Sequence, residues 1–172
     1  MHIFPIKNDP KFHFFPGVNL SYFWKIHTTF RKFDTNKTEA MIKMQDLQVG
    51  DYVMADFGGQ KWEGTITEFN RTEKEVCVET EVQEFWFRPE VLYPIPLNDE
   101  QLVKLNFEKE ENSDNTVKYK KGAFRVFLPE KDNFSRVEIW YREDRRTLNH
   151  HLSVHELQNH YLQMTKVVLS RS

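Results

Sequence analysis

Cysteine is nearly absent from this 172-residue sequence, and long apolar runs are absent altogether. The single cysteine, Cys77, cannot form an internal disulfide, which is typical of proteins from a reducing compartment. No segment approaches the roughly 20 consecutive apolar residues of a membrane-spanning helix. Residues 1–18 are interrupted by Pro5, Pro10 and Pro16 and do not resemble a secretory signal. We therefore expect a cytoplasmic protein without a membrane partner.

Recognisable catalytic motifs are missing as well. The sequence contains no phosphate-cradling glycine loop, no Walker motif and no nucleophile elbow. Neighbouring carboxylates such as Glu143-Asp144 fall in polar segments, whereas general acid–base catalysis needs a desolvated carboxylate beside a partner. No histidine lies near Cys77 in the sequence to activate its thiol. These absences favour a protein that is not an enzyme and needs no cofactor.

Charge is nearly balanced overall but uneven along the chain. The formal net charge is −2, which gives no reason to expect indiscriminate binding to nucleic acid. Residues 1–40 hold six Lys or Arg against three Asp or Glu, a net of +3, and nine aromatic residues without a regular period. We interpret residues 1–43 as a basic, aromatic-rich arm. It packs on the rest of the protein or docks on another chain, including a second copy in a homo-oligomer, through Tyr22, Phe23 and Trp24.

Residues 44–97 have the pattern of short strands joined by tight turns. Gly58-Gly59 suits a hairpin turn, residues 70–74 form a polar turn, and Pro89-Glu90 ends another strand. Five short strands at this spacing predict an SH3-like β-barrel, a type of domain that binds peptides in aromatic grooves. The expected strands cover residues 52–55, 62–69, 75–80, 85–88 and 91–93.

This region has more aromatic residues than one small core needs. Alternate residues of a strand face opposite ways, so Phe85 and Phe87 cannot share a face with Trp86. One of these two sets must lie outside the core or beneath another segment. We predict a protein-binding surface here, with Trp62, Phe85, Trp86 and Phe87 as candidate residues.

Residues 98–172 predict a small α+β domain. Asn98 is suited to cap a short helix, with Gln101 completing a capping box, and Glu108–Asn115 is expected to be a charged loop. Strand-like runs follow at 116–120, 123–128 and 134–141. The helix predicted at 153–166 begins with a capping box of Ser153 and Glu156 and carries an apolar stripe. The predicted fold class is α+β and mostly β: an SH3-like five-stranded barrel, then a small antiparallel sheet packed by a C-terminal helix.

Basic and aromatic residues gather around Trp140. Aromatic rings beside cations bind single-stranded nucleic acid or nucleotides. Glu138 and Glu143 dilute the positive charge, so a solvated mixed face is the favoured interpretation. Nucleic acid is therefore an alternative partner, less favoured than protein. The candidate residues are Lys118, Lys120, Arg136, Trp140, Arg142, Arg145 and Arg146.

Four histidines occur within residues 150–160. A zincin helix needs two histidines four residues apart, whereas His155 and His160 are five apart, roughly 140° around a helix. His151 and His155 have the right spacing, but the predicted helix begins between them. A metal-dependent enzyme is a second alternative, and His151 and His155 are its weak candidate ligands. It requires three such side chains, or two and a carboxylate, to converge.

Several segments together resemble a family of small uncharacterised proteins of Bacteroidetes genomes, phages and prophages. Residues 1–40 lie outside the resemblance, and Met164-Thr165-Lys166 departs from the Leu-Thr-Gly-like ending usual in such proteins. The resemblance implies a mobile-element context and supplies no catalytic residues. We predict a non-enzymatic binding protein that recognises a host or phage protein. The matching segments are Leu47–Val53 (LQVGDYV), Tyr93–Leu102 (YPIPLNDEQL), Asn106–Lys109 (NFEK) and Val154–Tyr161 (VHELQNHY).

Overall fold

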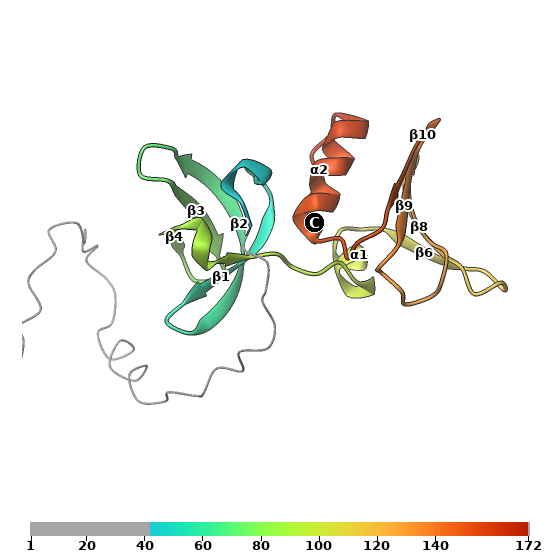
Figure 1. The fold of residues 1–172 in the computed structure, drawn as a ribbon, viewed down its shortest axis with the longest axis horizontal. Coiled ribbons are helices and arrows are strands. Elements are labelled where there is room, and N and C mark those ends of the chain that lie inside the picture. Colours follow the sequence, from blue (N-terminus) through green and yellow to red (C-terminus); the bar gives the residue numbers. More distant parts are fainter. Residues whose placement is uncertain (1–41, 172) are drawn as a thin grey trace, which may run out of the picture. The chain divides into compact units, whose positions relative to one another are not determined.

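Two five-stranded antiparallel sheets and a C-terminal helix make the fold mostly β, as the sequence predicts (Figure 1). The structure is a computed structural model that describes residues 42–171. All of these residues belong to one compact unit. The predicted arm at 1–43, with Tyr22, Phe23 and Trp24, falls outside the described residues except at its last two positions.

The first sheet has the strand order β4-β3-β2-β1-β5. All five predicted strands of this region are present, but no pairing joins the edge strands β4 and β5 within residues 42–171. The sheet is therefore open, and the closure that would make it an SH3-like barrel is not observed. Its elements are η2 (Met44–Asp46), β1 (Tyr52–Phe57), β2 (Gln60–Asn70), β3 (Glu75–Thr80), β4 (Glu84–Phe87), η3 (Pro89–Val91) and β5 (Leu92–Tyr93).

A glycine and a bulge shape the pairing of β2 with β3. A Cβ at Gly64 would lie 2.5 Å from Val78 Cγ1 and 2.6 Å from the Glu79 carbonyl oxygen, so only glycine fits without displacing a strand. The register shifts between Ile66 and Glu68. Simple alternation predicts Glu68 on the same face as Ile66, and this prediction is wrong: the bulge turns Glu68 outward and packs Phe69 on the core.

The second sheet is a meander with the strand order β10-β9-β8-β7-β6. Its two edge strands were not predicted. The segment EKEE was expected to be a loop and forms β6, while DRRTL forms β10. Both are charged and lack apolar alternation. Lys120 pairs with Glu110 across the β6–β7 ladder, which stabilises one of these edges. The strands are β6 (Glu108–Glu111), β7 (Val117–Lys121), β8 (Phe124–Leu128), β9 (Val137–Tyr141) and β10 (Asp144–Leu148).

Both predicted helices are present: α1 (Asp99–Lys104) and α2 (Val154–Thr165). Asn98 Oδ1 caps α1 by accepting a hydrogen bond from the Gln101 N–H at 2.9 Å. The Gln101 side chain accepts instead from Arg171 Nη2 at 2.5 Å. The capping box of α2 is confirmed, since the Ser153 N–H donates to Glu156 Oε2 at 2.8 Å. The helix packs its apolar stripe into the core of the second sheet, where Leu157 is fully buried.

The last described residues join several elements. The Arg171 backbone N–H donates to the Tyr52 hydroxyl at 3.0 Å, and its guanidinium lies 4.2 Å from the centre of that ring. The same guanidinium pairs with Glu63 of β2 and with Gln101 of α1. The C-terminal segment therefore covers the part of the first sheet nearest β1. Neither α-helix of the described chain has the length and apolarity needed to cross a membrane.

Candidate functional site

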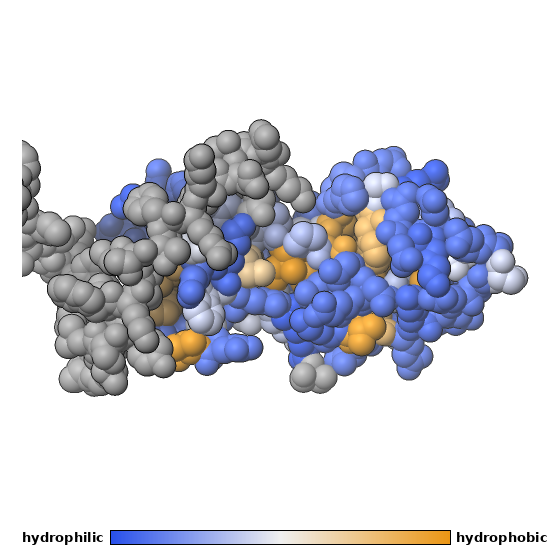
Figure 2. Space-filling view, turned by 90° about the horizontal axis from the view of Figure 1, so that it is seen from below, coloured by the Kyte–Doolittle hydropathy of each residue, from blue (hydrophilic) through white to orange (hydrophobic). Residues whose placement is uncertain are grey.

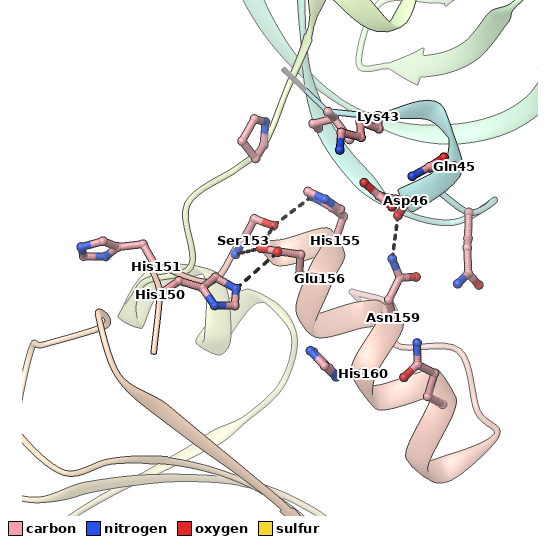
Figure 3. A pocket seen from close by; sticks show the side chains of 14 residues that line it. Lys43, Gln45, Asp46, His150, His151, Ser153, His155, Glu156, Asn159 and His160 are labelled. Atoms are coloured by element: carbon pink, nitrogen blue, oxygen red, sulfur yellow. Dashed lines mark hydrogen bonds and ion pairs between the residues drawn. The ribbon is translucent and has the colours of Figure 1, made fainter. Parts of the chain in front are cut away.

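A polar cavity of about 610 Å³ lies beside the first two turns of α2 (Figure 3). It brings together the four histidines that the sequence singles out, on a wall made by α2 and the segment before it. The opposite wall comes from η2 and its neighbours. The residues that line it are Ile42, Lys43, Gln45, Asp46, Gln48, Pro94, His150, His151, Ser153, His155, Glu156, Asn159, His160 and Gln163.

Hydrogen bonds determine the tautomer of His155. The Ser153 hydroxyl donates its one proton to Glu156 Oε2 at 2.6 Å, so its oxygen can only accept from His155 Nδ1, 3.0 Å away. His155 is therefore protonated at Nδ1 and leaves Nε2 as an acceptor. Its side chain is buried, and burial lowers the pKa of His155 although the charges of Glu156 and Asp46 oppose this shift.

His160 has the opposite tautomer. Arg146 Nη1 lies 3.1 Å from His160 Nδ1, and a guanidinium can only donate. The His160 proton is therefore on Nε2. Burial lowers the pKa of His160, and the positive charge of Arg146 lowers it further. The cavity thus has one histidine whose free nitrogen accepts a hydrogen bond and one whose free nitrogen donates.

The histidine cluster brings no three metal-ligating side chains together at one point within the part of the chain that the structure describes. No group of three His, Cys, Asp or Glu side chains among residues 42–171 is placed to hold a metal ion. Of the weak candidates, His151 is exposed and His155 is buried against Ser153. The Glu156 carboxylate is occupied by the capping box and by His150 Nε2 at 3.4 Å. Within residues 42–171, the converging ligands that a metal-dependent enzyme requires are not observed.

The predicted protein-binding aromatics divide between the two faces of the first sheet. Phe87 is buried and Phe85 half-buried on the core face, where Phe85 stacks on Phe57 with ring centres 5.3 Å apart. Alternation places Trp62 on the same face of β2 as the core residue Ile66. Trp62 lies near the end of the strand, however, and is 39% exposed. Trp86 is on the other face and is 44% exposed. The four rings therefore do not form one surface.

Carboxylates surround Trp86 on its own face. Cross-strand pairing puts Glu68, Cys77 and Trp86 in one row across β2, β3 and β4. In the neighbouring row Glu79 lies directly opposite Glu84. All three glutamates are exposed, and none forms an ion pair with a described residue. We call Glu68, Glu79, Glu84 and Trp86 the acidic Trp86 face.

The region around this face is acidic as a whole. Residues 42–97 contain five Lys or Arg and eleven Asp or Glu, a net charge of −6. Large apolar side chains are exposed here only at scattered positions, which include Val49, Phe57, Val82 and the two tryptophans. The side of the described residues that Figure 2 shows is mostly hydrophilic. Charge, more than apolar area, therefore distinguishes this part of the molecule.

The second sheet presents a face of opposite sign. Cross-strand pairing puts Lys120, Arg125, Trp140 and Arg145 in one row across β7, β8, β9 and β10. Phe127 stacks on Trp140 at 5.3 Å, and the Arg145 guanidinium lies 4.8 Å from the Trp140 ring centre. We call Lys118, Lys120, Arg125, Phe127, Trp140 and Arg145 the basic Trp140 face.

Some predicted residues of this face lie elsewhere. Arg146 is on the other side of the sheet, where it bonds to His160 and to Gln163 Oε1 at 3.0 Å. Arg142 lies in the β9–β10 turn with φ of 57°. Arg136 is partnered by Glu138 at 3.5 Å. Sequence reasoning missed Arg125 and Phe127, although the alternation of β8 with buried Val126 and Leu128 places both on the outer face.

No protein-family model matches this chain, and no curated protein is significantly similar to it. The resemblance to phage and prophage proteins therefore stays a prediction. The surfaces themselves carry the functional inference. They comprise a polar histidine-lined cavity, an acidic face around Trp86 and a basic face around Trp140.

Proposed function

We propose that this chain is a non-enzymatic protein-binding module of phage or mobile-element origin. Its first sheet works as an SH3-like recognition surface and binds a basic segment of a host or phage protein at the acidic Trp86 face. The observation that carries this proposal is the exposed Trp86 ring beside three carboxylates without ion-pair partners among the described residues. Cysteine, metal and acid–base chemistry contribute nothing to it.

The physical basis is attraction of a cation to an aromatic ring framed by negative charge. A Lys or Arg over a tryptophan face gains about 0.5–2 kcal/mol, and nearby carboxylates add to this. Glu79 directly opposite Glu84 is a like-charge pair, which destabilises a sheet unless a cation neutralises it. A basic segment of a partner protein supplies that cation.

The position of the face favours an extended partner segment. Arg171, Tyr52 and Glu63 cover the sheet near β1, whereas Glu79, Glu84 and Trp86 on the side of β3 and β4 remain exposed. β4 is an edge strand, so one side of its backbone is unpaired in the sheet. Extended peptides bind such edges by adding a strand.

A peptide titration of the full-length chain tests this proposal. The probe is a synthetic extended peptide of alternating Arg and Ala, added to the ¹⁵N-labelled protein. We expect chemical-shift changes at the Trp86 indole N–H and at the amides of Glu68, Cys77 and Glu84. Trp86→Ala and the pair Glu79→Gln with Glu84→Gln should each abolish them. The pair Glu73→Gln with Glu90→Gln removes two exposed carboxylates elsewhere and should leave binding unchanged. Shifts that survive Trp86→Ala would exclude this face.

The basic Trp140 face supports a second candidate function, the binding of single-stranded nucleic acid. The observation that favours it is the row of Lys120, Arg125, Trp140 and Arg145 with Phe127 stacked beside Trp140. Stacking of a base on an aromatic side chain contributes about 1–3 kcal/mol, and phosphates add a salt-dependent attraction to the cations. Glu108, Glu110 and Glu138 on the same face weaken that attraction.

Fluorescence anisotropy with a labelled oligothymidylate at low and moderate salt tests the second candidate. Binding should weaken as salt rises. Trp140→Ala with Arg145→Ala should reduce affinity at least tenfold, whereas Arg71→Ala with Lys74→Ala, which removes two exposed cations of the first sheet, should not. Binding that does not depend on salt, or that survives the first pair of substitutions, would contradict nucleic-acid recognition at this face.

A further inference from the structure

Two outward-facing sheet surfaces of this chain have opposite charge, and each has a tryptophan. On the acidic Trp86 face, three glutamates have no ion-pair partner among residues 42–171. On the basic Trp140 face, Lys118, Arg125 and Arg145 likewise have no carboxylate partner among those residues. We infer that the acidic Trp86 face of one copy binds the basic Trp140 face of another copy.

The geometry of the two faces is compatible. Both faces belong to five-stranded antiparallel sheets, so neighbouring strands in each lie about 4.8 Å apart, and the Trp86 face is covered only on the side of β1. The glutamates stand on β2, β3 and β4, and the unpartnered cations stand on β7, β8 and β10. Sheets that pack face to face keep their strands roughly aligned, which lets charges on successive strands meet in turn.

The second face keeps cations that are not already paired within it. Lys120 and Arg136 are already paired within the second sheet, to Glu110 and Glu138. Lys118, Arg125 and Arg145 form no ion pair with another described residue and can meet the glutamates of the Trp86 face. Glu108 is a further carboxylate on the second face, but it lies on the edge strand β6, across the sheet from Arg145.

Such an interface is heterologous, because two different patches meet. Each copy that binds through one face keeps its other face free, so association continues head to tail into a ring or a filament. This inference rests on the proposed function of the Trp86 face and names its partner as a second copy. An oligonucleotide that binds the Trp140 face would compete with the assembly.

Sedimentation velocity of the full-length protein across a concentration series at low and moderate salt tests the inference. We expect the sedimentation coefficient to rise with concentration and the rise to shrink in salt. Charge reversal of either face should give a monomer: Glu68→Lys, Glu79→Lys and Glu84→Lys in one variant, Lys118→Glu, Arg125→Glu and Arg145→Glu in the other. Mixed in equal amounts, the two variants should associate again, because each then offers only faces that complement the other. Glu73→Lys with Glu90→Lys is the control that keeps association.

Each result separates this inference from its alternatives. A wild-type protein that stays monomeric at low salt, or reversed variants that still associate alone, would overturn it. If the wild type is monomeric but the Arg-Ala peptide still shifts Trp86, the proposed function survives with a different basic partner. If the peptide fails too, both proposals fall. Should a triple variant not fold, Glu84→Lys on β4 and Arg145→Glu on β10 change single exposed edge residues and make the same comparison.

Discussion

The side-chain amide of Gln158 binds the backbone of Tyr52, 106 positions earlier in the chain: Gln158 Oε1 accepts from the Tyr52 N–H at 2.9 Å. The same amide nitrogen donates to the carbonyl oxygens of Gly50 at 2.8 Å and Leu169 at 3.0 Å. One buried side chain therefore ties α2 to the start of β1 and to the C-terminal segment. It satisfies three backbone groups that no regular helix or strand pairing reaches.

Replacing Gln158 by Ala should destabilise the protein strongly. The substitution leaves buried backbone groups without partners, each of which costs about 1–3 kcal/mol. We expect the free energy of unfolding to fall by about 2–4 kcal/mol, measured by urea denaturation. Gln45→Ala removes an exposed glutamine of η2 and should change the free energy of unfolding by less than about 0.5 kcal/mol. Equal losses for the two variants would contradict a central role for Gln158.

Asp51 should make stability decrease as pH rises. Burial raises its pKa from 3.8 to about 7, although the Gln48 N–H donates to Asp51 Oδ2 at 2.8 Å. The folded state therefore resists ionisation. The contribution of protonated Asp51 to folded-state stability is therefore complete below the unfolded pKa near 4. It is lost as pH rises to about 7.

Asp51→Asn should remove this dependence. It should stabilise the protein at pH 8 relative to wild type, by a free energy of about 4 kcal/mol at most, and not at pH 4. Denaturation of both proteins across this range gives the difference directly, with Asp56→Asn as a more exposed control. Parallel pH curves for wild type and Asp51→Asn would show that Asp51 does not titrate in this way.

The two histidines of the cavity should have opposite tautomers. Long-range ¹⁵N–¹H correlation spectra at a pH where they are neutral should show His155 protonated at Nδ1 and His160 at Nε2. Arg146→Ala should release the tautomer of His160 and raise its pKa, since the neighbouring positive charge is lost. Arg142→Ala, in the adjacent turn, is the matched control. If the pKa of His160 is the same in wild type and in Arg146→Ala, the contact between the two side chains would be refuted.

Gly64→Ala should disturb the pairing of β2 with β3. The new Cβ would meet Val78 Cγ1 at 2.5 Å and the Glu79 carbonyl oxygen at 2.6 Å, and the second is backbone that cannot rotate away. We expect a loss of about 2–3 kcal/mol in the free energy of unfolding. Gly59→Ala meets no atom within 4 Å and costs only the strain of its positive φ, roughly 1 kcal/mol. A larger loss of unfolding free energy in Gly59→Ala than in Gly64→Ala would contradict the steric explanation.

Sequence patterns predicted elements where apolar alternation or capping chemistry was local. The strand from Glu75 to Thr80 has an apolar centre, Val76 to Val78, between polar ends, and Ser153 with Glu156 marks the start of α2 within four residues. Strands β6 and β10 escaped prediction because nothing in EKEE or DRRTL alternates. They form because β7 and β9 offer free edges beside them. The bulge at Ile66–Glu68 escaped prediction for a different reason: the register of a strand depends on its partner strand.

The sequence by itself determined that Trp86 lies on the opposite face from Phe85 and Phe87, because strand geometry allows no other arrangement. It also determined that cations crowd around Trp140. Only the tertiary structure decided which faces stay exposed and which charges find partners. Arg146 turned inward to His160, whereas Arg125 and Arg145 joined Trp140 in one row. Such outcomes depend on pairing between residues far apart in the chain, and no local pattern records that pairing.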